Sequence, residues 1–234
     1  MAWIEHDYAD TAALTAAVAG HLHAACADAL QARGRALLAL AGGRTPFPIY
    51  RALAAESMPW SDIVAMPGDD RCVAHAHAAS NVAALREAFA AADGLRIEAL
   101  TVAEGDAQAS LRHARDMLAR NRDAFDAVVL GMGEDAHTAS LFPGAEALPA
   151  AMTMDAREDA FLVVPDPLPP EAPFPRITLG LARLLRARGL HLIVTGARKR
   201  DVLRAAQATH DPLRMPISAL LHAPDATVHI HWSP

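Results

Sequence analysis

Short apolar runs alternate with longer amphipathic or alanine-rich segments along the whole chain, a pattern typical of buried strands separated by helices. The apolar runs predict strands at residues 36–41, 62–67, 125–132, 160–166, 190–196 and 227–232. In the run at 125–132, Val128, Val129 and Leu130 are consecutive. An uninterrupted apolar run of this kind is expected when helices cover both faces of a parallel strand.

Helical spacing predicts helices at residues 10–33, 46–57, 80–92, 106–121 and 197–208. Gly34 ends the first of them, Pro46 lies in the first turn of the second, and Ser80 is the N-cap of the third. Residues 68–79 are predicted to form a loop, and the proline-rich segment 165–175 a stiff connector. The alternation predicts an α/β fold with a doubly wound, mostly parallel, Rossmann-like sheet flanked by helices, in a single domain spanning residues 1–234.

Ligands of doubly wound sheets bind beyond the carboxyl ends of the strands. This rule directs attention to the loops that follow residues 41, 67, 130 and 195. These loops contain most of the residues that we consider as candidates for chemistry.

Composition narrows the class of ligand. The 234 residues include 21 basic and 27 acidic side chains, giving a net charge of −6. No global positive field therefore favours a nucleic-acid partner, and an anionic ligand would need a local cluster of cations and backbone N–H groups.

The chain also lacks the marks of secretion or membrane insertion. Cys26 and Cys72 are too few for a disulfide framework, and residues 1–14 do not have the layout of a signal peptide. No apolar run approaches the roughly 20 residues that span a bilayer. We expect a cytoplasmic monomer that binds neither nucleic acid nor a membrane.

The segment after the first predicted strand, "AGGRTP", is suited to a phosphorylated ligand. Gly42 and Gly43 permit close approach of the backbone, while Arg44 and Thr45 offer a guanidinium and a hydroxyl group. A tight strand-to-helix turn with no ligand is the alternative.

Two further segments supply charged groups. In "PGDDRC", Asp69 and Asp70 are neighbours whose side chains point opposite ways in an extended segment, so we expect different roles for them, and Arg71 follows. A solvated Asp–Arg pair is the alternative there.

Arg176 and Lys199 are the other candidate cations. Lys199 lies near a predicted helix start, a position that disfavours a cation unless an anion shares the site. An ordinary exposed lysine is equally consistent with this position.

The segment "GMGEDAHTASLFPG", residues 131–144, contains the chain's best candidate for acid–base chemistry. His137 follows Asp135 by two residues, a spacing that places both side chains on one side of an extended loop and lets the carboxylate orient the imidazole. A neutral imidazole removes a proton from water that attacks a carbonyl group. Thr138 and Ser140 add hydroxyl groups; an incidental loop histidine is the alternative.

Taken together, these segments resemble the 6-phosphogluconolactonase family. "AGGRTP", "DDR" followed by Ser80 and Asn81, "GMGEDAHTASLFPG", "PRITL" and "TGARK" occur in that family's order, between about residues 36 and 221. The resemblance implies a doubly wound α/β fold and hydrolysis of 6-phospho-D-glucono-1,5-lactone to 6-phospho-D-gluconate with no metal or organic cofactor. This step is shared by the pentose phosphate and Entner–Doudoroff pathways.

The resemblance also implies roles for residues. His137 would be the general base that activates water, and Asp135 its orienting partner. The residues implied to surround the phosphate and the sugar are Gly42, Gly43, Arg44, Thr45, Asp69, Arg71, Arg176 and Lys199.

Three positions depart from the family pattern. Arg44 replaces the usual serine, Asp70 the glutamate of "DER", and Ala136 the glycine of "DGH". Ala136 implies either a negative φ angle at this position or tolerated backbone strain.

Three other classes of protein are alternatives to this interpretation. A glucosamine-6-phosphate deaminase shares the fold, but "DDR" and "HTASLF" match the lactonase pattern better. A sugar-phosphate-sensing regulator needs a DNA-binding module, and residues 1–35 before the first predicted strand accommodate only one long helix.

The third class is a metal enzyme, because H-x-H pairs occur at 21/23, 75/77 and 229/231. These pairs lie far apart in the sequence. We therefore expect scattered histidines and no metal site.

Overall fold

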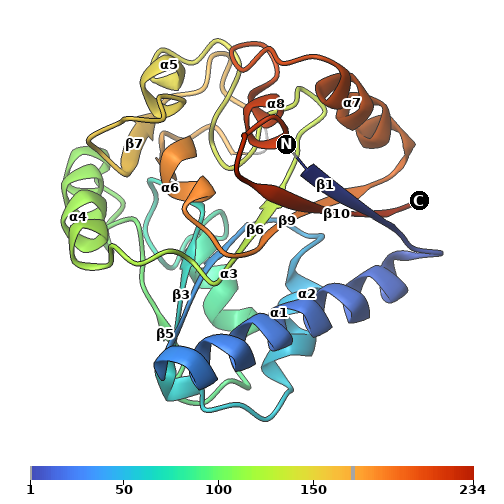
Figure 1. Cartoon of the computed structure of the whole chain (residues 1–234). Coiled ribbons are helices and arrows are strands. Elements are labelled where there is room, and N and C mark those ends of the chain that lie inside the picture. Colours follow the sequence, from blue (N-terminus) through green and yellow to red (C-terminus); the bar gives the residue numbers. More distant parts are fainter. Residues whose placement is uncertain (1, 170–171) are drawn as a thin grey trace.

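The computed structural model describes residues 2–169 and 172–234. A parallel sheet of seven strands runs through its centre, in the order β1-β10-β9-β6-β2-β3-β5 (Figure 1). The strands are β1 (Ala2–Asp7), β2 (Ala36–Leu40), β3 (Ile63–Pro67), β5 (Arg96–Ile97), β6 (Ala127–Gly131), β9 (Leu190–Thr195) and β10 (Thr227–Ser233). The predicted α/β class with a mostly parallel sheet is confirmed.

Helices cover both faces of this sheet (Figure 1). One buried apolar cluster joins a face to α1 (Thr11–Arg33), α2 (Phe47–Ala54) and α3 (Asn81–Ala88). A second cluster joins the other face to α4 (Ala107–Arg120), α5 (Leu148–Ala151), α6 (Leu181–Leu185), α7 (Ala197–Ala208) and α8 (Pro216–Leu221). No helix in the described part of the chain has both the length and the apolar character needed to cross a bilayer.

A small antiparallel sheet lies beside the main one and consists of β4 (Asp69–Arg71), β8 (Arg176–Leu179) and β7 (Ala160–Val163), in that order. Arg71 of β4 is paired in register with Arg176 of β8. Segments about 100 residues apart in the sequence thus bring two arginines together.

The long helix α1 ends at Gly34 as predicted, while Asp10, predicted to lie inside the helix, is its N-cap. Asp10 accepts a hydrogen bond from the Ala13 amide at 2.8 Å, and Gly34 adopts a left-handed conformation with φ of 69°. Leu14, Val18 and Leu22 form its buried stripe.

Most predicted elements are confirmed with shifts of a few residues, but several predictions were wrong. The predicted loop 68–79 contains strand β4, because Asp69–Arg71 pair with β8 rather than with solvent. The helix expected at 80–92 ends at Ala88. The strand predicted at 160–166 exists as β7 but belongs to the small antiparallel sheet.

The first strand is β1, not the one at residue 36, because Ala2–Asp7 pair with β10 along their whole length. Strands β5 and β8 and helices α5, α6 and α8 were also not predicted. A short 3-10 helix, Trp60–Asp62, precedes β3. Within the predicted connector 165–175, residues 170 and 171 lie outside the described residues.

Candidate active site

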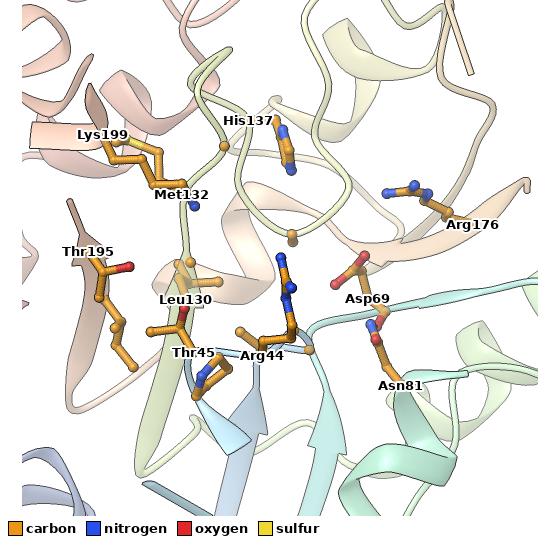
Figure 2. Close-up of a pocket in the computed structure, with 18 of the residues that line it drawn as sticks. Arg44, Thr45, Asp69, Asn81, Leu130, Met132, His137, Arg176, Thr195 and Lys199 are labelled. Atoms are coloured by element: carbon orange, nitrogen blue, oxygen red, sulfur yellow. The ribbon is translucent and has the colours of Figure 1, made fainter. Parts of the chain in front are cut away.

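A cavity of about 330 Å³ opens where β2, β3, β6 and β9 end (Figure 2). The loops that follow these four strands are those singled out from the sequence, so their predicted convergence is confirmed. Every predicted site residue except Asp135 lines the cavity, and Asp135 contacts one that does. The lining members of the predicted set are Gly42, Gly43, Arg44, Thr45, Asp69, Arg71, His137, Arg176 and Lys199.

Asp135 and His137 form a hydrogen-bonded pair in the loop after β6. The Asp135 Oδ1 atom lies 2.5 Å from His137 Nδ1 and also accepts the His137 backbone N–H at 3.2 Å. Partial burial raises the pKa of Asp135, but the hydrogen bonds and charge of His137 outweigh it, so this pKa lies below its ordinary value. Because an ionised carboxylate accepts the Nδ1 proton, the Nε2 atom of a neutral His137 is left with the lone pair.

The backbone of this loop has an unusual conformation at Ala136 and passes close to the pair at Gly133. Ala136 has φ of 64°, so the negative φ considered from the sequence is wrong and the alternative, tolerated strain, holds. The Ala136 amide donates to the Gly133 carbonyl at 3.1 Å, and its own carbonyl accepts from Ile217 at 3.1 Å. A Cβ atom on Gly133 would lie 2.2 Å from His137 Nδ1, so only glycine leaves room for the imidazole.

Arg71 and Arg176 present two adjacent guanidinium groups to the cavity. Arg71 donates to the Ala79 carbonyl at 2.9 Å and to Asn81 Oδ1 at 2.8 Å. Arg176, only 5% exposed, donates to the Ala172 carbonyl at 3.1 Å and stacks over Phe142. The Nε atom of each is buried and has no partner among the described residues. Burial lowers the pKa of Arg176 and the charge of Asp69 opposes this, while the nearby charge of Arg71 lowers it further, so an anion would relieve the repulsion.

Asp69 and Asp70 have the different roles expected from their alternation. Asp69 lines the cavity and accepts a hydrogen bond from Ser140 at 2.5 Å. Asp70 points the other way, is fully buried, and accepts from the amides of Arg71, Asn81 and Val82 at 2.8, 2.6 and 3.2 Å. Asp70 therefore anchors the start of α3, while Asp69 faces the site.

The loop after β2 supplies backbone donors. Gly43 has φ of 106°, and the amides of Gly43, Arg44 and Thr45 donate to no other residue that the structure describes. The exposed Arg44 side chain rises from this loop toward His137, which descends from the loop after β6 (Figure 2). Unpaired amides beside a guanidinium are a common arrangement for holding oxyanions.

Lys199 lies in the first turn of α7, where the free N–H groups of the helix already favour an anion. Its ammonium group forms no ion pair or hydrogen bond with any described residue. Four cations, Arg44, Arg71, Arg176 and Lys199, thus surround a cavity whose lining includes one carboxylate, Asp69. The local positive charge inferred from the sequence is present in a chain of net charge −6.

Sequence reasoning missed other lining residues, among them Asn81, Met132 and Thr195. Asn81 donates to the Asp69 carbonyl at 2.7 Å and occupies the space that a side chain on Gly42 would fill. The position of Asn81 directly after the helix cap Ser80 could have indicated that it lines the site, because the start of this helix faces the end of the neighbouring strand.

Comparisons with known proteins agree with this geometry. The sequence model of the family described as glucosamine-6-phosphate isomerases/6-phosphogluconolactonase matches residues 9–232. The 6-phosphogluconolactonase of Pseudomonas aeruginosa is 35% identical over 225 residues, covering 94% of this chain and 89% of that protein. The 6-phosphogluconolactonase of Rhizobium meliloti is 33% identical, covering 98% of both chains.

A solved structure agrees as well. The crystal structure of a 6-phosphogluconolactonase from Shewanella baltica has a TM-score of 0.91 and 31% sequence identity, covering 99% of this chain and 97% of that one. The chain therefore belongs to the glucosamine-6-phosphate isomerase/6-phosphogluconolactonase family.

Proposed function

We propose that this protein hydrolyses 6-phospho-D-glucono-1,5-lactone to 6-phospho-D-gluconate. The observation that carries the proposal is the Asp135–His137 pair at a cavity surrounded by four cations. A carboxylate-oriented imidazole suits attack of water on a carbonyl group, and the cations suit a phosphorylated substrate. The lactonase names of the relatives favour this reaction over deamination of an amino sugar.

In the proposed reaction, His137 Nε2 takes a proton from water while the water oxygen forms a bond to the lactone carbonyl carbon, C1. The tetrahedral oxyanion collapses, the bond between C1 and the ring oxygen breaks, and the proton held by His137 passes to that oxygen. The new carboxylic acid loses its proton to solvent. Asp135 keeps its negative charge and stabilises the imidazolium.

The amides of Gly43, Arg44 and Thr45 are the proposed donors to the substrate's oxyanions. Arg71, Arg176 and Lys199 provide charge for the phosphate, with Asp69 and Gly42 completing the wall of the site. In substrate bound in this way, the carbonyl carbon faces His137 Nε2. Water reaches the same point through the opening of the cavity. No step in this scheme draws on a metal ion.

The test follows the lactone, generated in situ, by NMR with no protein, with the wild type and with His137→Ala. Because the lactone opens spontaneously, the protein-free rate is subtracted at matched pH. We expect the wild type to accelerate opening and His137→Ala to lose about 10²-fold or more of that acceleration. His210→Ala, which alters an exposed histidine outside the cavity, serves as the matched control.

Equal acceleration by the wild type and His137→Ala would contradict the role of this histidine. Ammonia release from glucosamine 6-phosphate, without faster opening of the lactone, would replace the proposed reaction with deamination.

A further inference from the structure

Four histidines lie on one face of the main sheet, at the end opposite to β5. His6 on β1 is in register with His231 on β10, and His229 on β10 is in register with His191 on β9. Residues in register on neighbouring strands point to the same face, as do residues two apart on one strand. The expectation that the histidines are scattered was therefore wrong for this part of the chain.

His21 completes the group from the helix above. It belongs to α1, which packs on this face of the sheet, and its ring centroid lies 5.4 Å from that of His6 and 5.3 Å from that of His231. We refer to His6, His21, His191, His229 and His231 as the histidine cluster. None of its members lines the catalytic cavity.

The nitrogen atoms of the cluster lie close enough to share an ion. One ring nitrogen from each of His6, His21 and His231 lies within 4.8 Å of the other two. In a tetrahedral zinc site with Zn–N bonds of about 2.0–2.1 Å, ligand nitrogens are separated by roughly 3.3 Å. Side-chain rotations that move each nitrogen by about 1 Å would bring these three to that spacing.

Two buried members of the cluster, His191 and His231, favour the neutral form. Burial lowers the pKa of His191 to about 3 and that of His231 to about 2, and the charges of the neighbouring imidazoles act in the same direction. In the part of the chain that the structure describes, no carboxylate contributes to either shift. A neutral imidazole keeps one lone pair, which is the form that binds metal ions.

Hydrogen bonds hold these rings in place. His231 Nδ1 lies 2.9 Å from the Tyr8 hydroxyl and His231 Nε2 lies 3.1 Å from His191 Nδ1. His6 Nε2 lies 3.1 Å from His229 Nδ1. Partners on the second ring nitrogen fix the orientation of metal-binding histidines, and His191, His229 and Tyr8 are placed to do this.

We propose that His6, His21 and His231 bind a first-row transition metal ion of the zinc class, in a site separate from the catalytic cavity. Binding replaces one hydrogen bond of His231, and water fills the remaining position. Imidazole ligands favour zinc, nickel and copper ions over magnesium or calcium, which take oxygen ligands.

An ion can reach this position, because β1 is an edge strand and both His6 and His21 are half-buried. Its three ligands come from β1, α1 and β10. A bound ion would therefore join the first strand and first helix to the last strand.

The experiment uses the full chain without a histidine tag, stripped of metal by a chelator and then dialysed. Zinc chloride is titrated by calorimetry, and the bound metal is counted by mass spectrometry after gel filtration. The variants are His6→Ala and His21→Ala, and the matched control is His23→Ala, which removes a half-buried histidine of the same helix outside the cluster. His137→Ala tests whether the ion binds at the cavity instead.

We expect one zinc ion per chain in the wild type, in His23→Ala and in His137→Ala, and at least a tenfold loss of affinity in His6→Ala and His21→Ala. Zinc at about 100 times its dissociation constant is expected to raise the Tm of the wild type by about 5–10 °C. Cobalt should give the visible absorption of a tetrahedral ion in the wild type but not in His21→Ala.

Zinc binding weaker than about 100 μM in the wild type would overturn the proposal. So would equal binding by His21→Ala and His23→Ala, or loss of binding in His137→Ala alone. His21→Ala changes a half-buried helix position to a good helix former, so the comparison holds even if His6→Ala does not fold.

Discussion

At the scale of single residues, the candidate site depends on how little space surrounds the Asp135–His137 pair. Gly133, two residues before Asp135, passes directly beneath both side chains. Ala136, between the two, adopts a left-handed conformation that a glycine would take without strain. The loop therefore tolerates one departure from the family pattern, at Ala136, while Gly133 has no room for any side chain.

Gly133→Ala is expected to lower kcat by about 10²-fold or more, because the new Cβ atom would meet His137 Nδ1 at 2.2 Å and Asp135 Oδ1 at 2.4 Å and turn the base away from the substrate. Gly68→Ala is the control, since a Cβ atom there meets nothing within 4 Å. Steady-state lactonase kinetics of both variants check the prediction. A Gly133→Ala enzyme with wild-type kcat would show that the pair needs no such space.

Lys199→Ala is expected to raise KM by about 10- to 100-fold and to leave kcat within a factor of about three. Loss of one charged hydrogen bond costs about 1.5–3 kcal/mol, and a phosphate held equally in the ground and transition states affects KM alone. The neighbouring Arg198→Ala is the control, because Arg198 is 87% exposed and faces Glu134 at 4.0 Å. Unchanged kinetics in Lys199→Ala would remove this residue from the site.

At the scale of elements, two residues of β4 line the cavity and the third stabilises the fold. Asp69 and Arg71 face the cavity, while Asp70 between them accepts amide hydrogen bonds at the start of α3. The alternation of an extended strand explains this division, which the sequence predicted. The pairing of β4 with β8 could not be predicted, because it joins segments about 100 residues apart with no turn between them.

Asp70→Asn is expected to destabilise the protein by about 2 kcal/mol. The amide has one acceptor oxygen where the buried carboxylate receives three backbone N–H groups, and its NH₂ group would face donors. Urea unfolding at pH 7 measures the effect, with Asp28→Asn on the exposed side of α1 as the control. A change below about 0.5 kcal/mol would mean that α3 is held by its apolar face alone.

At the scale of the whole molecule, the parts that the sequence predicted are those with local signals. The strands 36–40, 63–67 and 127–131 are apolar on both faces, and α1 ends at the glycine C-cap Gly34. Strand β1 was missed because it lies at the edge of the sheet and because its apolar residues Trp3 and Ile4 are followed by polar ones, with no alternation between them. The histidine cluster was missed because strand register, rather than spacing along the chain, brings its members together.

We expect one cooperative unfolding transition for the whole chain, as proposed for a single domain. The main sheet is shared by segments from both ends of the chain, and the small sheet packs into the same apolar cluster as α4 to α8. Scanning calorimetry of the chelator-treated protein should give equal calorimetric and van't Hoff enthalpies. A calorimetric enthalpy near twice the van't Hoff enthalpy, with two resolved peaks, would instead indicate two units that unfold separately.

The pairing of β1 with β10 has a consequence for how the protein is made. Ala2 meets Thr227 and Asp7 meets Trp232, so β1 can pair with β10 only after the more than 200 residues between them have been synthesised. Until then the backbone polar groups of β1 lack their final partners. Contacts of such separation are costly to close and form late. In the nascent chain, β1 is therefore open to wrong pairing while the residues up to β10 are synthesised.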